Sequence, residues 1–403
     1  MVREWKLSSI DRFSLNLPIN GAWIYRESPD YGKMKESLAK LQEAYPQLGG
    51  RYDIRSNSLK WDDLESAPLP FSTVSCREYS ADGLAGNPEI WKLVAPYDAK
   101  AFRKGKIGPF SAVLAELNDG SVLFIQCAHG IMDAHTFYRL IDEWASLYRG
   151  DQTEIPFAEQ FPLSVPEVLS REETLLQNRK KGWVKVGTRQ KLRALWNIVR
   201  ARKTYRTTCH VEVSPEELKQ LRKESGAGLN AVLAALATKT LAQHIGREEC
   251  YRMNFMVNLR GMIEGVEAAY FGNMSMPVSA GREYDLSADS AVLAEQIETA
   301  LFDELTSEKL GENIRLMHSN DSHRLPFFPF DPSDITSSAP KVFHINNLLS
   351  FKACDLDWGT GKPVYAFPST LTEMIDFWRP VSKGPVLIVY GGAASGIMKK
   401  QDK

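Results

Sequence analysis

The chain has 403 residues, of which 43% are hydrophobic and 25% are charged, and its formal net charge is -1. This length exceeds what one hydrophobic core usually holds, so we expect two domains. The near-neutral charge excludes a general nucleic-acid binder, and no apolar run reaches the ~18 residues of a membrane span. The five cysteines are scattered, odd in number and without a CxxC pair, which excludes a disulfide framework and a thiolate zinc site. We therefore expect a soluble, cytoplasmic protein.

The first half of the chain alternates predicted helices and strands. One apolar stripe within residues 34–44 predicts a helix that Pro46 ends. Residues 108–118 and 121–128 are typical of two strands, and the Asp-Gly pair between them predicts a hairpin turn.

A second helix is predicted directly after this hairpin. From about Ala134, the apolar residues Phe137, Trp144 and Tyr148 recur at helical spacing, and Gly150 ends the pattern. The helix therefore has one apolar face that packs against the strands before it.

The second half begins after a segment that is first proline-rich and then strongly basic. Ser214 and Glu217 form a capping box at a helix start. Residues 229–245 are typical of a buried helix of small side chains, and residues 250–261 and 385–392 are typical of interior strands. This alternation predicts an α/β protein with three segments: an N-terminal domain (1–175), a basic crossover (176–205) and a C-terminal domain (206–403).

The stretch "HGIMDAH" places His129, Asp133 and His135 directly after the strand at 121–128. Three interpretations compete: a metal site, a catalytic base with its supporting group, and a polar strand–turn–helix junction. We expect no metal, because a turn followed by a helix need not make these ligands converge. In the catalytic interpretation, His129 is a general base, Gly130 allows close backbone approach, and His135 is a solvated or capping residue.

A second motif far along the chain supports the catalytic interpretation. Residues 357–363 read "DWGTGKP". Together with His129–Asp133 they resemble the HxxxD and DFGWG motifs of the BAHD acyltransferases, relatives of chloramphenicol acetyltransferase and of peptide-synthetase condensation domains. The stretches "VNLRG" (257–261) and "YFGNM" (270–274) are similar to signatures that this family carries between the two motifs. The resemblance implies two chloramphenicol-acetyltransferase-like domains, each a mixed sheet with flanking helices, joined by a long crossover.

The resemblance also implies roles for single residues. His129 would be the general base. Asp133 would point away from the substrate and support the turn by pairing with an arginine, for which Arg260 is the best candidate. Asp357 would be a structural anchor. The glycine that follows the motif aspartate in the family is Ala134 here.

Other residues are expected near the substrates. Gly359 and Gly361 would give a tight backbone path and bind the cofactor, although a surface turn is the alternative. Asn273 would donate to the thioester or to pantetheine, or else satisfy a backbone turn. Asn346 and Asn347 stand where the family has Thr-Ser, and are candidates for oxyanion or substrate contacts.

The expected reaction is transfer of an acyl group from acyl-CoA to a hydroxyl or amine of a small molecule. It needs no acyl-enzyme and no permanently bound cofactor, and we expect a monomer. Two alternatives stay open: a condensation-type enzyme that forms amides from carrier-bound donors, and a non-catalytic binding protein. Ala128 argues against the first, because condensation domains carry a second histidine there.

One basic segment has no role in this scheme. Residues 174–211 hold eleven basic and no acidic side chains, so the rest of the chain has a net charge of -12, which is -1 minus 11. Residues 179–206 would attract CoA phosphates, an acidic carrier protein or an anionic membrane surface. The alternative is a solvated connector.

Overall fold

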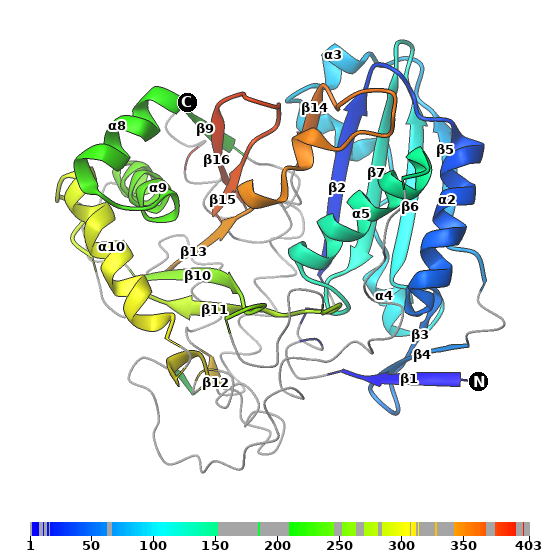
Figure 1. Ribbon diagram of the computed structural model, residues 1–403, viewed down its shortest axis with the longest axis horizontal. Helices are drawn as coiled ribbons and strands as arrows, with labels where there is room; N and C mark the ends of the chain where they lie inside the picture. The colour runs from blue at the N-terminus through cyan, green and yellow to red at the C-terminus, as the bar shows by residue number, and fades with distance from the viewer. Residues whose placement is uncertain are drawn as a thin grey trace.

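The computed structural model consists of two halves, each built on a mixed β-sheet with helices packed on it (Figure 1). This confirms the expected two-domain α/β architecture. The residues that the structure describes are 2–7, 11, 14–15, 17–62, 67–151, 184–185, 209–245, 252–262, 270–280, 284–306, 308–311, 313, 327–328, 342–367, 375–391 and 398.

The first sheet has five strands. In spatial order they are β14 (Tyr365–Phe367), β2 (Pro18–Tyr25), β7 (Ser121–Ala128), β6 (Phe110–Glu116) and β5 (Phe71–Ser75). β6 and β7 form the predicted antiparallel hairpin, with Leu114 opposite Leu123. Every residue of β7 is buried, because helical segments pack on both faces of this sheet.

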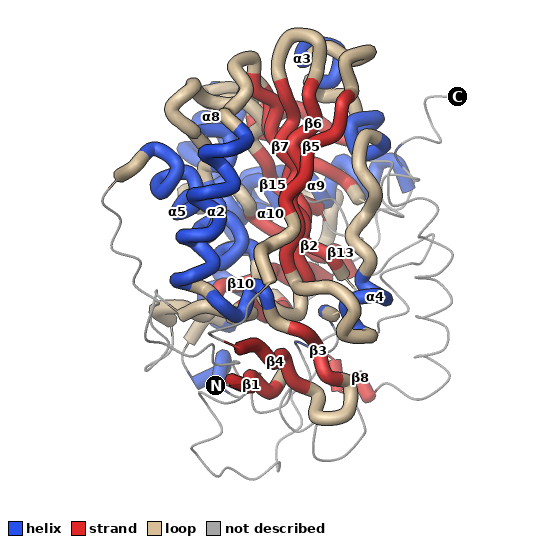
Figure 2. Tube along the Cα trace, turned by 90° about the vertical axis from the view of Figure 1, so that its right-hand side faces the viewer, coloured by secondary structure: helices blue, strands red, loops and turns tan. Residues whose placement is uncertain are grey.

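Two helices, α2 (Tyr31–Ala44) and α5 (Ala134–Arg149), lie side by side on one face of the first sheet (Figures 1 and 2). Trp144 on α5 donates from Nε1 to the Met34 carbonyl on α2 at 3.1 Å. The predicted apolar stripe of α5 is buried, and Gly150 ends the helix with a φ of 81°.

Short helical segments cover the opposite face. Leu84 of α3 and Ile90 of the 3-10 helix η2 pack with Ile24 and Phe124 of the sheet. The first domain also contains a three-stranded sheet in the order β1–β4–β3. The bounds of these elements are β1 (Val2–Lys6), η1 (Pro46–Gly49), β3 (Arg51–Asp53), β4 (Ser58–Asp62), α3 (Ala81–Leu84), η2 (Pro88–Lys92) and α4 (Ala99–Arg103).

The second sheet has six strands. In spatial order they are β11 (Ser275–Ser279), β10 (Arg252–Asn258), β13 (Val342–Asn347), β15 (Ile375–Trp378), β16 (Val386–Tyr390) and β9 (Cys209–Val213). Figure 1 shows the helices of this half on the side of the sheet away from the first domain. They are α8 (Pro215–Ser225), α9 (Leu229–Ile245) and α10 (Ser290–Glu304). A separate pair of short strands comprises β8 (Val184–Lys185) and β12 (Phe327–Phe328).

The helices of the second half form as the sequence predicts. Ser214 Oγ accepts the Glu217 backbone N–H at 3.1 Å and so caps α8. α9 lies in the core between the sheet and α10, where small side chains permit close approach of the two helices.

The chain returns to the first domain late in the sequence. β14 pairs antiparallel with β2, and the 3-10 helices η3 (Leu349–Phe351) and η4 (Ala353–Asp355) precede it. Residues 349–367 therefore help to build the first domain, although they fall within the range 206–403 expected for the second.

In the part of the chain that the structure describes, no helix has the length and apolarity to cross a bilayer. The basic crossover at 176–205 lies outside the described residues, apart from β8.

Candidate active site

The turn between β7 and α5 carries His129, the first residue after the strand. Ile131 and Met132 of this turn are fully buried. A Cβ atom on Gly130 would lie 2.3 Å from the carbonyl oxygen of Asp11, so glycine alone fits this close backbone approach. Packing on both sides therefore fixes the path of the chain at His129.

The imidazole of His129 is half-buried. Its Nδ1 atom is buried and forms no hydrogen bond with any described residue. The backbone N–H of His129 donates to the Leu17 carbonyl at 2.9 Å. The ring is thus placed by its backbone and by packing.

Asp133 ends the turn and caps α5. One carboxylate oxygen accepts the Thr136 backbone N–H at 2.9 Å. The other accepts the Met274 backbone N–H at 2.8 Å and the Arg260 guanidinium at 2.7 Å. The side chains of Asp133 and Arg260 are 2% and 1% exposed. The structure therefore brings these two residues together in a buried ion pair that joins the two domains.

Arg260 is the centre of a wider hydrogen-bond network. A guanidinium has donors on three nitrogens in a fixed plane, which a lysine cannot reproduce. The acceptors lie at 2.7 to 2.9 Å and are Asp133 Oδ2, Asn258 Oδ1, Thr136 Oγ1 and the carbonyl oxygens of Tyr270 and Gly272.

Opposing effects act on the Asp133 carboxyl. Burial alone would raise its pKa, since the charged form loses its hydration. The charge and hydrogen bond of Arg260, together with the two backbone N–H donors, outweigh burial and hold the pKa of Asp133 below its ordinary value. Asp133 is therefore a fixed anion and not a proton carrier at neutral pH.

Thr136 and Asn258 belong to this network but have no role assigned from the sequence. Thr136 stands three residues after the capping aspartate, where side chains meet the start of a helix. Asn258 stands two residues before Arg260, a spacing that puts both on the same side of an extended chain. These two spacings are the features of the sequence that could have indicated a role for Thr136 and Asn258.

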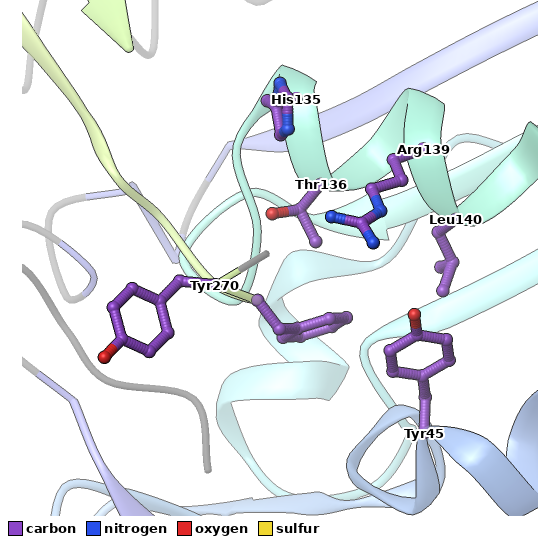
Figure 3. Close-up of a pocket in the computed structure, with 7 residues that line it drawn as sticks. Tyr45, His135, Thr136, Arg139, Leu140 and Tyr270 are labelled. Atoms are coloured by element: carbon purple, nitrogen blue, oxygen red, sulfur yellow. The ribbon is translucent and has the colours of Figure 1, made fainter. Parts of the chain in front are cut away.

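His135 lies half-buried in the first turn of α5, with Nδ1 3.5 Å from Asn258 Nδ2. The sequence suggested that His135 could cap α5, but the structure shows that Asp133 caps this helix. Figure 3 shows His135 at the rim of a small pocket, between Tyr45 and Tyr270. The pocket volume of about 10 Å³ suits about one water molecule, so it does not hold a substrate.

The motif at residues 357–363 forms a tight turn around the Asp357 carboxylate. Oδ1 accepts the backbone N–H of Gly359 at 2.7 Å and that of Gly361 at 3.0 Å. Both glycines have positive φ angles, 84° and 106°, which residues with a Cβ rarely adopt. Arg149, at the end of α5, donates to the Asp357 carbonyl.

This turn lies at the far end of α5 from His129. Trp358 is fully buried, with its ring centroid 5.0 Å from that of Trp144 and 5.6 Å from that of Tyr148. These two residues lie more than two turns into α5, which at ~1.5 Å per residue is roughly 15 to 20 Å along the helix. The structure does not bring the motif glycines to His129.

Gly359→Ala is expected to lower the free energy of unfolding by about 1 to 2 kcal/mol, because an alanine is strained at this φ angle. Urea unfolding followed by circular dichroism measures the change. Gly32→Ala in α2 is the matched control, since alanine suits a helical position and should leave stability unchanged or raised. Equal stability of Gly359→Ala and the wild type would contradict the need for glycine.

Asn273 is 2% exposed and lies between the residues that contact Asp133 and Arg260. Its Oδ1 accepts the Ser275 hydroxyl at 3.0 Å. Asn273 is therefore part of the domain junction, and its Nδ2 group is not used in this hydrogen bond.

Asn346 and Asn347 point to opposite faces of the second sheet, as consecutive strand residues do. Asn346 Nδ2 donates to Asp376 Oδ1 at 3.1 Å. Asn347 Nδ2 donates to Asn230 on α9, on the side away from the first domain. The structure thus separates these two candidates.

Asp376 is a further buried polar residue, with no role assigned from the sequence. It lies on β15 and is 2% exposed. Burial raises the pKa of its carboxyl to about 7, although the hydrogen bond from Asn346 acts in the opposite direction. The feature of the sequence that could have indicated a role for Asp376 is the position of an acidic residue inside a short apolar strand.

Asp376 is expected to make the stability of the fold fall as pH rises. Its folded pKa lies above the unfolded value, so the native state binds the proton more tightly, and stability is greatest below the unfolded value near 3.8. Between there and about pH 7 this group should contribute a loss of about 1.4 kcal/mol per pH unit. Unfolding of Asp376→Asn at pH 4.5 and 6.5 should lack this contribution, and parallel pH curves for both proteins would refute it.

Among the described residues, no three His, Cys, Asp or Glu side chains converge as metal ligands.

Most of the chain matches a known family. The model of the Transferase family matches residues 77–377, a stretch that contains His129, Arg260 and Asp357. No curated protein sequence matches the chain.

Solved structures share the fold across nearly the whole chain. F. graminearum TRI101 complexed with ethyl coenzyme A has a TM-score of 0.71 at 13% identity and covers 99% of this chain and 97% of its own. Vinorine synthase has a TM-score of 0.66 at 16% identity, and the match covers 98% of this chain and 91% of vinorine synthase. The first condensation domain of the CDA synthetase has a TM-score of 0.60 at 11% identity, and the match covers 99% of this chain and 94% of that domain.

The two sheets, joined through the Asp133–Arg260 ion pair, form the two-domain fold that TRI101 and vinorine synthase share. The chain belongs to the Transferase family, and its resemblance to the BAHD enzymes is confirmed.

Proposed function

We propose that the protein transfers an acyl group from acyl-CoA to a hydroxyl or amine of a small molecule, with His129 as the general base. One observation carries this proposal: a half-buried imidazole fixed at a rigid turn, with a buried Nδ1 that has no hydrogen-bond partner among the described residues. TRI101 of F. sporotrichioides was solved with coenzyme A and T-2, and TRI101 of F. graminearum with coenzyme A and deoxynivalenol, which supports the choice of donor and a small-molecule acceptor.

In the proposed reaction, His129 Nε2 takes the proton of the acceptor O–H or N–H as that atom attacks the thioester carbonyl. A new C–O or C–N bond forms and gives a tetrahedral oxyanion. The C–S bond then breaks, and the imidazolium returns its proton to the CoA thiolate. Asp133 takes no part in these transfers, because Arg260 and two backbone N–H groups occupy its carboxylate.

The oxyanion needs a fixed hydrogen-bond donor. Asn346 faces the first domain, and only one of the two N–H bonds of its amide is needed for Asp376. We assign the second N–H of Asn346 to the oxyanion or the substrate, and the free amide of Asn273 to the pantetheine arm. Asn347 is less suited, since it is tied to Asn230 on the opposite face of the sheet.

Thiol release with a panel of acyl-CoAs and alcohol or amine acceptors tests this function, with mass spectrometry of the products. Release should require both substrates. Intact-protein mass after incubation with acyl-CoA alone should stay unchanged, because no nucleophilic residue is acylated. A covalent acyl adduct, or the absence of acceptor-dependent release with every donor, would overturn the proposal.

We further propose a cytoplasmic monomer. The described cysteines Cys76, Cys127, Cys209 and Cys354 form no disulfide with one another, which suits a reducing compartment. Size-exclusion chromatography with light scattering tests the oligomeric state.

The basic segment at 174–211 is proposed to attract the CoA phosphates. Replacing Lys191, Arg193, Arg200 and Arg202 together by glutamine should raise the KM for acyl-CoA and flatten its dependence on ionic strength, at nearly unchanged kcat. The measurement is a set of KM values between low and high salt. An unchanged KM and salt slope would make the segment a connector, and vesicle co-sedimentation would then test an anionic membrane as partner.

A further inference from the structure

The second sheet has one polar face. Asn254 pairs with His344 across β10 and β13, and Asn346 pairs with Asp376 across β13 and β15. Residues paired in register point to the same face, and Asn258 follows on that face at the end of β10. The opposite face is apolar and packs on α9 and α10.

This polar face looks toward the first domain. Trp378, Leu387 and Val389 lie on it and belong to the core cluster of the first domain. Asn254, His344 and Asp376 are nonetheless 1%, 6% and 2% exposed. A sheet face buried between two layers is normally apolar, so its polarity indicates that it recognises a ligand.

Asp376 is a buried acidic group on the polar face, whereas Glu212, at the β9 edge of the same face, is exposed. Oδ1 accepts the Asn346 amide, and no described residue donates a hydrogen bond to Oδ2. No described cation acts on this carboxyl either, since burial and Asn346 are the influences on its ionisation. A buried carboxyl without a cation is costly, and natural folds usually pair such a group.

Aromatic side chains lie near this carboxyl, since Trp378 follows Asp376 by two residues on the same face of β15. Tyr138, on the second turn of α5, stacks on Phe351 with centroids 5.0 Å apart and tilts against Trp378 at 5.9 Å. Burial, with a contribution from the nearby Asp376, raises the pKa of Tyr138, and its hydroxyl is buried without a partner among the described residues. Tyr138 lies four residues, or about 6 Å along the axis, from the start of the helix that follows the His129 turn.

We propose that Asp376 is a specificity-determining residue that binds a protonated amino group of the acceptor, with Tyr138 and Trp378 as the walls of this subsite. The inference rests on the proposed acyltransferase function and names the acceptor class. An ammonium neutralises the buried carboxylate, fills the vacant acceptor Oδ2 and is favoured by adjacent aromatic faces. A neutral hydroxyl would supply a hydrogen bond but no charge.

The bound amino group is not the one that is acylated. A protonated amine has no lone pair and cannot attack a thioester. The acceptor therefore carries at least two polar groups: an ammonium held by Asp376, and a hydroxyl or second amine presented to His129.

The test compares binding of phenethylamine with that of phenethyl alcohol, which has nearly the same shape and no charge. Titration calorimetry is done on the full chain as wild type and as Asp376→Asn, which keeps the acceptor for the Asn346 amide. The wild type should bind phenethylamine at least tenfold more tightly than the alcohol. In Asp376→Asn this preference should disappear, while binding of the alcohol changes little. Asp355→Asn, which alters an acid paired with Lys362 near the surface, is the matched control and should keep the preference.

Equal affinity of the wild type for the two probes, or an unchanged preference in Asp376→Asn, would overturn the proposal. Turnover adds a second measurement with amino alcohols and the corresponding alkanols as acceptors. Asp376→Asn should raise the KM for the amino alcohol about tenfold or more at similar kcat, and leave the KM for acyl-CoA unchanged. Absence of any thiol release would count against the acyltransferase function and not against the amine subsite, because the binding experiment needs no turnover.

Discussion

His129→Ala is expected to lower kcat for acyl transfer by about 10²- to 10⁴-fold, the usual contribution of a positioned general base. The fold should persist, because Nδ1 has no hydrogen bond to lose among the described residues and the neighbouring Ile131 and Met132 hold the turn by packing. Steady-state thiol release and thermal unfolding measure the two effects separately.

His210→Gln is the matched control. His210 is exposed on β9, at the outer edge of the second sheet, and its replacement should leave kcat unchanged. A His129→Ala protein with wild-type kcat and an intact fold would remove the imidazole from the mechanism. A loss of activity that accompanies unfolding would be resolved with His129→Asn, which keeps a polar side chain of similar reach.

Asp133→Ala and Arg260→Ala are each expected to destabilise the protein by about 3 to 5 kcal/mol, because each leaves an uncompensated buried charge. The double variant should cost less than the sum of the two, since it removes both charges together. Urea or thermal unfolding of the four proteins gives the coupling energy. Asp133→Asn, which keeps the shape and one acceptor oxygen, should be milder than Asp133→Ala.

Strict additivity would show that the pair carries no coupling and would contradict this account of the domain junction. The pair also has a pH signature. The pKa of Asp133 is lowered in the fold, so its contribution to stability is present above the unfolded value of 3.8 and is lost as pH falls through the lower folded value.

Local sequence patterns were sufficient to predict the strands and the helix that position His129. The hairpin β6–β7 and the helix α5 follow from alternation, an Asp-Gly turn and a helical stripe, all of which are read within a short window. The Asp133–Arg260 pair came from a resemblance between motifs, because the two residues are remote in the sequence and no local pattern connects them.

Other parts of the site depend on contacts that no short window contains. Asp376 meets Asn346 because β13 and β15 pair in parallel across an intervening segment, and parallel pairing leaves no turn signal in the sequence. The motif glycines shape a turn near Arg149 at the end of α5, and their contact with the cofactor stays a prediction. Their positive φ angles favour glycine at both positions.

The late return of the chain through β14 has a consequence for biosynthesis. During translation β2 remains an open edge of the first sheet until Phe367 has emerged from the ribosome, because its β14 neighbour lies there. The pocket between Trp144 and Tyr148 likewise stays unfilled until Trp358 arrives. The N-terminal domain therefore cannot complete its folding until most of the chain has been synthesised, and until then the nascent chain exposes an unpaired strand that other chains can add to.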